Sequence, residues 1–196
     1  MRAPFAIISL LLSFVLAPLA HSQPLTISTL AGNSGQGGAD GTGAAARFLN
    51  PGGIAADSSG NLYVADSDNH TIRKILSGGV VTTLAGVAGV SGSADGTGSS
   101  ARFNQPQGIA VDGLGNVYVA DTGNHTIRQI TPGGVVSTLA GSAGNPGSAD
   151  ATGTTATFYE PQGIALIAGG PRIFAADAGI HVLRPTNCGG VGPSGL

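Results

Sequence analysis

Residues 106–130 read PQGIAVDGLGNVYVADTGNHTIRQI, and residues 51–75 read PGGIAADSSGNLYVADSDNHTIRKI, so one pattern occurs twice, 55 residues apart. A weaker third copy begins at Pro161, again 55 residues later, and a phenylalanine stands three residues before the first proline of each copy. Repetition at a fixed period predicts one structural unit per period, each packed against its neighbours. We therefore expect a repeat protein with three units.

Each unit contains four short runs that are typical of strands. In the first unit we expect them at Gly53 to Asp57, Leu62 to Asp66, Thr71 to Ile75 and Val80 to Leu84. Clusters of Gly, Asn, Asp and Pro separate the runs and indicate tight turns. Repeated four-stranded antiparallel sheets arranged around an axis form a β-propeller. The expected fold is thus all-β, a half or partial propeller with about three four-stranded blades.

At residues 106–128 the pattern resembles an NHL repeat, and the resemblance spans roughly residues 25–184. Unit three departs from the pattern, because Ile167 replaces an aspartate, Pro171 replaces an asparagine, and Pro185 is expected to end the third strand. The strand Ser-Thr-Leu-Ala-Gly is similar to that of bacterial exported NHL proteins. The resemblance implies an NHL β-propeller, a family whose members serve mostly as binding platforms and sometimes as lyase or lactonase scaffolds.

The composition favours the same fold class and excludes one class of partner. Only 9% of the residues are charged, 41% are hydrophobic, and 34 of 196 are glycine. Such a composition favours an all-β chain with many turns. The formal net charge is −2. No run of cations is longer than Arg73-Lys74, so a nucleic-acid partner is not expected.

Residues 1–22 have the pattern of a secretory signal peptide. Arg2 gives the positive start, residues 5–19 are apolar, and Ala20-His21-Ser22 places small residues where a signal peptidase reads them. We expect cleavage before Gln23, a mature net charge of −3, and a secreted or periplasmic protein without stable membrane insertion. The alternative is a short retained anchor, although the apolar run is shorter than the roughly 20 residues of a membrane span.

The repeat domain is predicted over residues 23–185, with units at about 25–86, 87–141 and 142–185. Residues 186–196 are expected to be a flexible Gly-rich tail. Cys188, the only cysteine, falls in this tail. A single thiol excludes an internal disulfide, so packing and strand pairing must stabilise the fold.

The strands at the two ends of the repeat domain are complementary. Leu25 to Leu30 has the sequence of a fourth strand, whereas unit three stops after its third strand near Arg184. Closed propellers usually have four to eight blades, so three leave exposed edges. Two explanations stay open: two copies form a homodimer with a six-bladed ring, or the chain is a piece of a longer propeller.

Acidic, amide and imidazole side chains recur between the second and third strands of each unit. The candidate ligand-binding residues are Asp66, Asn69, His70, Asp121, Asn124, His125, Asp177 and His181. Three carboxylate–imidazole pairs on one face would suit a divalent metal. A structural role is favoured, because a residue that every blade needs recurs in every blade. In that role the aspartates would accept hydrogen bonds from backbone amides of the turn, and Asn69 or Asn124 would adopt a left-handed conformation.

Two further motifs recur, and both have structural interpretations. The Asp-Gly-Thr-Gly loops at 40–43 and 95–98 hold too few oxygen ligands for a calcium loop, so we expect turns in which Asp caps a short helical turn. Phe48, Phe103 and Phe158 are expected as plugs between blades, the alternative being surface aromatics for ligand stacking.

The expected function is that of a non-catalytic module that binds a protein, peptide or glycan. No Gly-x-Ser-x-Gly elbow and no phosphate loop occur in the sequence, so no catalytic residue, metal site or cofactor is predicted. One alternative is a metal-assisted lyase or lactonase-like hydrolase with its site at the central channel. Another is a fragment of a larger extracellular sensor.

Overall fold

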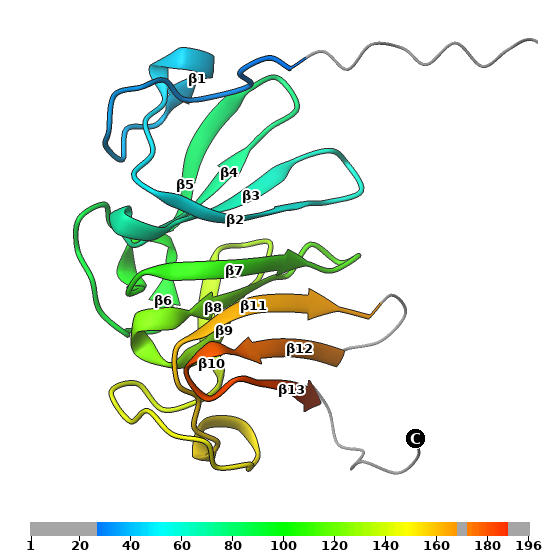
Figure 1. The fold of residues 1–196 in the computed structure, drawn as a ribbon. Helices are drawn as coiled ribbons and strands as arrows, with labels where there is room; N and C mark the ends of the chain where they lie inside the picture. Colours follow the sequence, from blue (N-terminus) through cyan, green and yellow to red (C-terminus); the bar gives the residue numbers. More distant parts are fainter. Residues whose placement is uncertain (1–26, 168–171, 188–196) are drawn as a thin grey trace, which may run out of the picture.

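The computed structural model describes residues 27–167 and 172–187, which form three antiparallel sheets that follow one another (Figure 1). Each sheet is one blade of a propeller, and these described residues are all-β apart from single 3-10 turns. No helix in the described ranges has the length and apolarity needed to span a bilayer. The expected signal peptide, Cys188 and nearly all of the expected tail lie outside the described residues.

Blade 1 is a meander of four strands with a short fifth strand on its outer edge. The strands are β2 (Pro51–Ala56), β3 (Leu62–Asp66), β4 (Thr71–Ile75), β5 (Val80–Gly86) and β1 (Gly41–Thr42). Their order in the sheet is β1-β5-β4-β3-β2, with antiparallel pairing throughout. The four predicted strands are therefore confirmed, and β1 is an addition that the sequence pattern did not reveal.

Blade 2 repeats this arrangement, and blade 3 contains three strands among the described residues. Blade 2 consists of β6 (Gly96–Thr97), β7 (Pro106–Val111), β8 (Val117–Asp121), β9 (Thr126–Ile130) and β10 (Val135–Ala140). Blade 3 consists of β11 (Pro161–Leu166), β12 (Arg172–Asp177) and β13 (Val182–Asn187). In blade 3 the outermost described strand is β13, in the order β11-β12-β13.

Two expectations about strand ends are wrong. β13 continues through Pro185, which pairs with Phe174, instead of ending there. A proline lacks only the backbone N–H, and a strand at the edge of a sheet tolerates that loss. Residues 27–30, the described part of the expected first strand, form no strand within the single chain, where they do not pair with the open edge of β13.

Asp57 and Asp112 form the hairpins between the first two strands of blades 1 and 2. Asp112 Oδ1 accepts the backbone N–H groups of Leu114 and Asn116, and its Oδ2 accepts the Tyr118 hydroxyl at 3.1 Å. Gly115, in the left-handed region at φ 82°, completes the turn. Partial burial acts to raise the pKa of Asp112, but hydrogen bonds from Asn116 and Tyr118 outweigh it and lower that pKa.

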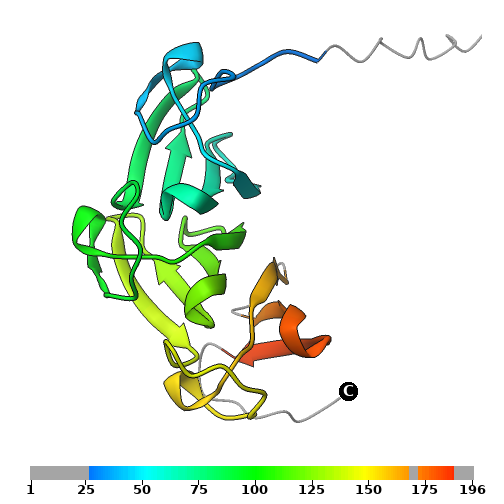
Figure 2. The ribbon, with the colours of Figure 1, turned by 60° about the vertical axis from the view of Figure 1, so that its left-hand side comes forward.

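The core lies between the blades as well as within them. Phe103 and Phe158 are 0% and 2% exposed, and each packs against the blade that precedes it. The structure thus agrees with the expectation of phenylalanine plugs at these two sites. Figure 2 shows the blades following one another along an open arc, with blade 1 at one end and blade 3 at the other.

Candidate functional site

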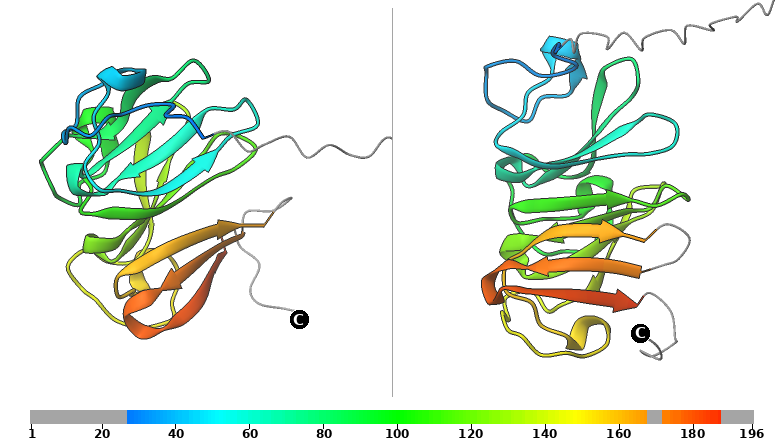
Figure 3. Two further views of the ribbon diagram at one scale, coloured as in Figure 1. Left: turned by 45° about the horizontal axis from the view of Figure 1, so that its top comes forward. Right: turned by 45° about the vertical axis from the view of Figure 1, so that its right-hand side comes forward.

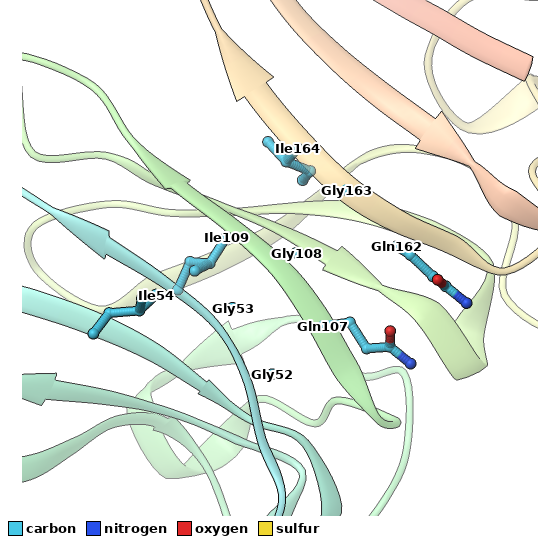
Figure 4. Close-up of a pocket in the computed structure, with 9 residues that line it drawn as sticks. All are labelled: Gly52, Gly53, Ile54, Gln107, Gly108, Ile109, Gln162, Gly163 and Ile164. Carbon is cyan, nitrogen blue, oxygen red and sulfur yellow. The ribbon is translucent and has the colours of Figure 1, made fainter.

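The strands β2, β7 and β11 lie side by side on the inner side of the arc (Figure 3). They line an open groove of about 460 Å³. Equivalent positions of the three repeats face it: Gly52, Gln107 and Gln162; Gly53, Gly108 and Gly163; Ile54, Ile109 and Ile164. The groove is therefore built by the first strand of every blade, and we take it as the candidate site (Figure 4).

Glycine is required where the inner strands approach one another. A Cβ at Gly53 would lie 2.4 Å from the carbonyl oxygen of Gln107, and a Cβ at Gly108 would lie 2.2 Å from that of Gln162. Both distances are far shorter than any van der Waals contact. The glycines thus bring the inner strands close enough to form one continuous surface.

The groove is uncharged and bears two free amide side chains. Figure 4 shows Gln107 and Gln162 extending from neighbouring strands toward the same side. Within the described residues neither amide has a hydrogen-bond partner. No ionisable side chain lines the groove. The arrangement can therefore donate and accept hydrogen bonds, whereas it offers no group for acid–base or nucleophilic chemistry.

The candidate aspartates lie elsewhere, in buried polar clusters at the ends of β3, β8 and β12. Asp66, Asp121 and Asp177 are all 0% exposed. Asp66 Oδ1 accepts the backbone N–H of Leu49 at 2.8 Å, and Oδ2 accepts Arg73 at 2.8 Å. Their carboxylates thus hold the segment that enters each blade, and they do not face the groove.

Asn69 and Asn124 belong to the same clusters. The Asn69 amide donates to Asp66 Oδ2 at 2.8 Å and to the carbonyl of Gly37 at 2.8 Å. The expected left-handed conformation of Asn69 or Asn124 is wrong. The residue with positive φ is the histidine that follows, at 57° for His70. The buried hydrogen bond between Asn69 and Asp66 keeps the asparagine in the 3-10 turn, so the left-handed residue is the next one along the chain.

The candidate histidines connect consecutive blades. His70 Nδ1 accepts the backbone N–H of Gln105 at 3.1 Å, and His125 Nδ1 accepts that of Glu160 at 3.1 Å. His181 is exposed. In the described part of the chain, no three His, Cys, Asp or Glu side chains gather as a metal ion would require. The structure therefore keeps the three Asp–His pairs apart, one to a blade.

Three buried arginines are the residues whose importance sequence reasoning missed. Arg73 and Arg128 are 0% exposed, and Arg184 is 7% exposed. Arg128 donates to Asp121, to Asp95 and to two backbone carbonyls, and its guanidinium lies 5.2 Å from the centre of the Phe103 ring. The recurrent spacing of seven residues from each strand-end aspartate to an arginine was the available signal.

The Asp-Gly-Thr-Gly loops are turns, but the expected capping by aspartate is wrong. The short 3-10 turns η1 (Gly43–Ala45) and η3 (Gly98–Ser100) begin after Thr42 and Thr97 without a side-chain cap. Asp40 accepts hydrogen bonds from Thr83 and Arg73 instead. Burial acts to raise the pKa of Asp40, but these hydrogen bonds outweigh it and lower that pKa.

Gln107 and Gln162 were also missed. The pattern would have pointed to them only through their position, because a glutamine follows the first proline of units two and three where Gly52 stands in unit one. The two glutamines lie close together because the packing of the blades brings residues that are 55 positions apart into one groove.

Comparison with known proteins agrees with this architecture. The family model of the NHL repeat matches residues 48–75 and 103–130. NHL repeat-containing protein 2 from Bos taurus is 33% identical over 151 residues, which cover 71% of this chain and 21% of that protein. Protein SUPPRESSOR OF QUENCHING 1, chloroplastic, from Arabidopsis thaliana is 40% identical over 93 residues, 46% of this chain and 9% of that protein.

A solved structure shows the same fold. A protein of unknown function from Bacteroides thetaiotaomicron superposes with a TM-score of 0.60 at 30% identity, over 64% of this chain and 32% of that one. The chain spans about a fifth of the length of NHL repeat-containing protein 2. On the repeats, the blades and these matches together, the chain belongs to the NHL-repeat family of β-propeller proteins.

Proposed function

We propose that this protein is a non-catalytic binding module that holds a peptide segment of a partner protein along the groove of β2, β7 and β11. The observation that carries the proposal is the lining of the groove, which combines free amide side chains, glycines and isoleucines with no ionisable group. Such a surface recognises hydrogen-bonding groups and apolar side chains without altering the ligand chemically.

The inner strands provide a second means of recognition. β2, β7 and β11 are each the terminal strand of a sheet, so one edge of each strand has no neighbouring strand within its own blade. Extended peptides bind exposed strand edges through main-chain hydrogen bonds, and pockets for alternate side chains add specificity. Because the groove is uncharged, the segment that contacts it is expected to be uncharged as well.

The recurrent aspartates and arginines also support a non-catalytic role, because they are used within the fold. Asp66, Asp121 and the arginines that pair with them are buried and hydrogen-bonded within the blades. They are therefore needed for stability and are not available to a ligand. The exported location expected from residues 1–22 would make the partner an extracellular or periplasmic protein.

Selection of peptides from a random library displayed on phage, followed by affinity measurement with fluorescently labelled peptides, tests this function. The double variant Gln107→Ala/Gln162→Ala is expected to weaken binding roughly tenfold or more, since it removes two hydrogen-bonding side chains. Gln129→Ala removes the same kind of side chain outside the groove and is the matched control. Failure to select any peptide, or equal affinities for all three proteins, would contradict the proposal.

A further inference from the structure

Both interfaces between described blades are built in the same way. At the first, Phe103 of blade 2 packs in one cluster with Ile72 and Ala85 of blade 1. At the second, Phe158 of blade 3 packs with Ile127 and Ala140 of blade 2. At each interface a phenylalanine thus packs against residues of the third and fourth strands of the preceding blade, and the isoleucines are 0% exposed.

The two ends of the arc expose the halves of one more interface of this kind. Leu183 stands in β13 where Ile72 and Ile127 stand in their strands, yet it is 77% exposed. At the other end Ile54 is 61% exposed, whereas its counterpart Ile109 is 7% exposed. The apolar residues that the internal interfaces bury are therefore uncovered at both ends of a single chain.

A polar contact at the outer edge of the blades is also complete in blades 1 and 2 and incomplete in blade 3. In blades 1 and 2 a loop aspartate receives two hydrogen bonds from a threonine of the fourth strand. Asp40 accepts the Thr83 N–H at 3.1 Å and its hydroxyl at 3.0 Å. Asp95 accepts the Thr138 N–H at 3.2 Å and its hydroxyl at 3.0 Å. These contacts join the fourth strand to the loop that precedes its own blade.

Asp150 occupies this position in blade 3 without such a donor. Its side chain is 96% exposed, against 49% and 51% for its two counterparts, and among the described residues it pairs only with Arg184. The residue that matches the two threonines is Thr29, because Ser28-Thr29-Leu30-Ala31-Gly32 repeats the fourth-strand sequence. Thr29 lies at the opposite end of the arc.

Gly163 gives a third, independent indication. Gly53 and Gly108 are required because a Cβ would collide with the carbonyl oxygen of residue 107 or 162 in the next blade. A Cβ at Gly163 meets only the Ala176 side chain, at 3.2 Å, within one chain. A following blade placed like the others would bring the carbonyl of residue 52 against Gly163, so this glycine fits a third interface.

We propose that a second copy of this chain supplies that interface, so that two copies join head to tail into a six-bladed ring. Residues 28–32 of each copy pair with β13 of the other as its fourth strand. Phe48 then covers Leu183, and Thr29 donates to Asp150. Head-to-tail interfaces generate a closed ring when the rotation fits, and six blades lie within the usual four to eight. The groove becomes a complete channel only with both copies.

The proposed interface between two copies lacks one hydrogen bond that both internal interfaces have. The hydroxyl groups of Ser67 and Thr122 donate to backbone carbonyls of the next blade at 2.6 and 2.7 Å, whereas Ala178 stands at the equivalent position in blade 3. We therefore expect the interface between copies to be weaker than the interfaces within one chain, and the dimer to dissociate on dilution before the blades unfold.

Light scattering after size exclusion tests the proposal on the purified protein. The expected molar mass is twice that of one chain. Gly163→Ala is expected to shift the protein to monomer without changing its circular dichroism, while Gly113→Ala, a substitution into open space, leaves the dimer intact. A monomer for the unchanged protein at micromolar concentration, or polymers larger than a dimer, would overturn the proposal.

A second pair of variants tests the apolar contact. Leu183→Ser is expected to weaken dimerisation roughly tenfold or more, because it removes a side chain that only the second copy buries. Leu114→Ser makes the same change at a hairpin residue that is 82% exposed and outside the interface. Equal dissociation constants for the two variants would contradict the proposed packing.

Disulfide trapping tests the strand register. Lys74 pairs with Thr82 and Gln129 with Ser137, so Ser28 is expected opposite Pro185 of the other copy. Ser28→Cys combined with Pro185→Cys, in a Cys188→Ser background, should form covalent dimers on mild oxidation. Ser28→Cys with Val182→Cys is the out-of-register control. A disulfide within one monomer, or equal trapping of both pairs, would overturn the proposal.

Discussion

Replacing Phe103 by alanine is the perturbation that most directly tests whether the space between blades is the core of this protein. Phe103 is 0% exposed and packs with Ile72 and Ala85 of the preceding blade. Its ring also lies under the Arg128 guanidinium, 5.2 Å from the ring centre. The substitution therefore removes a plug that two blades share.

The structure sets the size of the expected effect. A phenylalanine buried to this degree costs about 3–5 kcal/mol when it becomes alanine, because the transfer free energy is lost and a cavity is left. The cavity cannot close easily, since the contact of Gly53 with the Gln107 carbonyl already holds the two blades at their closest distance. We expect a loss near the upper half of that range.

Urea unfolding followed by circular dichroism measures this loss, with Phe48→Ala as the matched comparison. Phe48 has the same place in blade 1 but no described blade in front of it, and it is only partly buried. In the Gly163→Ala background, which is expected to be monomeric, its replacement should cost clearly less than that of Phe103. If Phe103→Ala is too unstable to fold, Phe103→Leu gives the same ranking with smaller losses.

Two results would refute this reasoning. A loss below about 1 kcal/mol for Phe103→Ala would show that the ring is not a packed plug, because full burial alone is worth more than that. Equal losses for Phe48→Ala and Phe103→Ala in monomeric protein would show that the preceding blade contributes nothing to the burial of the ring.

Three further outcomes are expected. Arg128→Met should destabilise the fold by about 3–5 kcal/mol in urea unfolding, because it leaves the Asp121 carboxylate buried without its cation; a loss below about 1 kcal/mol would argue against that pairing. The pKa of Asp112 is lowered from its ordinary value of 3.8, so the stabilising contribution of its carboxylate is present above that value and is lost as the pH falls through the lowered pKa. The difference in unfolding free energy between the unchanged protein and Asp112→Asn should therefore be large at pH 7 and shrink in acid. Mass spectrometry of protein exported by a bacterial host should find Gln23 as the first residue, and an intact Met1 would contradict the expected cleavage.

The repeat pattern was sufficient to predict the blades, because each strand is specified by local properties. The run Val117-Tyr118-Val119-Ala120 combines β-branched, aromatic and small residues that favour a buried strand, and the Asp112 hairpin is specified by residues within six positions of it. Phe103 was predictable as a plug for a similar reason, since a large apolar residue that recurs with the period is needed at every interface.

The roles of the polar residues were decided by tertiary structure. Asp66, Asn69 and Arg73 form one buried cluster because two strands and the preceding loop converge on it, and residues 33 positions apart meet there. No local pattern specifies such a contact. The same holds for Asp40, which resembles a helix cap in sequence but pairs with a strand 43 residues away.

The candidate groove depends on tertiary structure to an even greater degree. Gln107 and Gln162 are unremarkable in sequence, and they become neighbours only because Gly108 lets two blades approach within contact distance of their backbones. The kind of blade and its repetition could therefore be predicted from the amino-acid order alone, since both rest on short-range preferences. Only the packing of whole blades decided which side chains are buried as structural ion pairs and which remain free to bind.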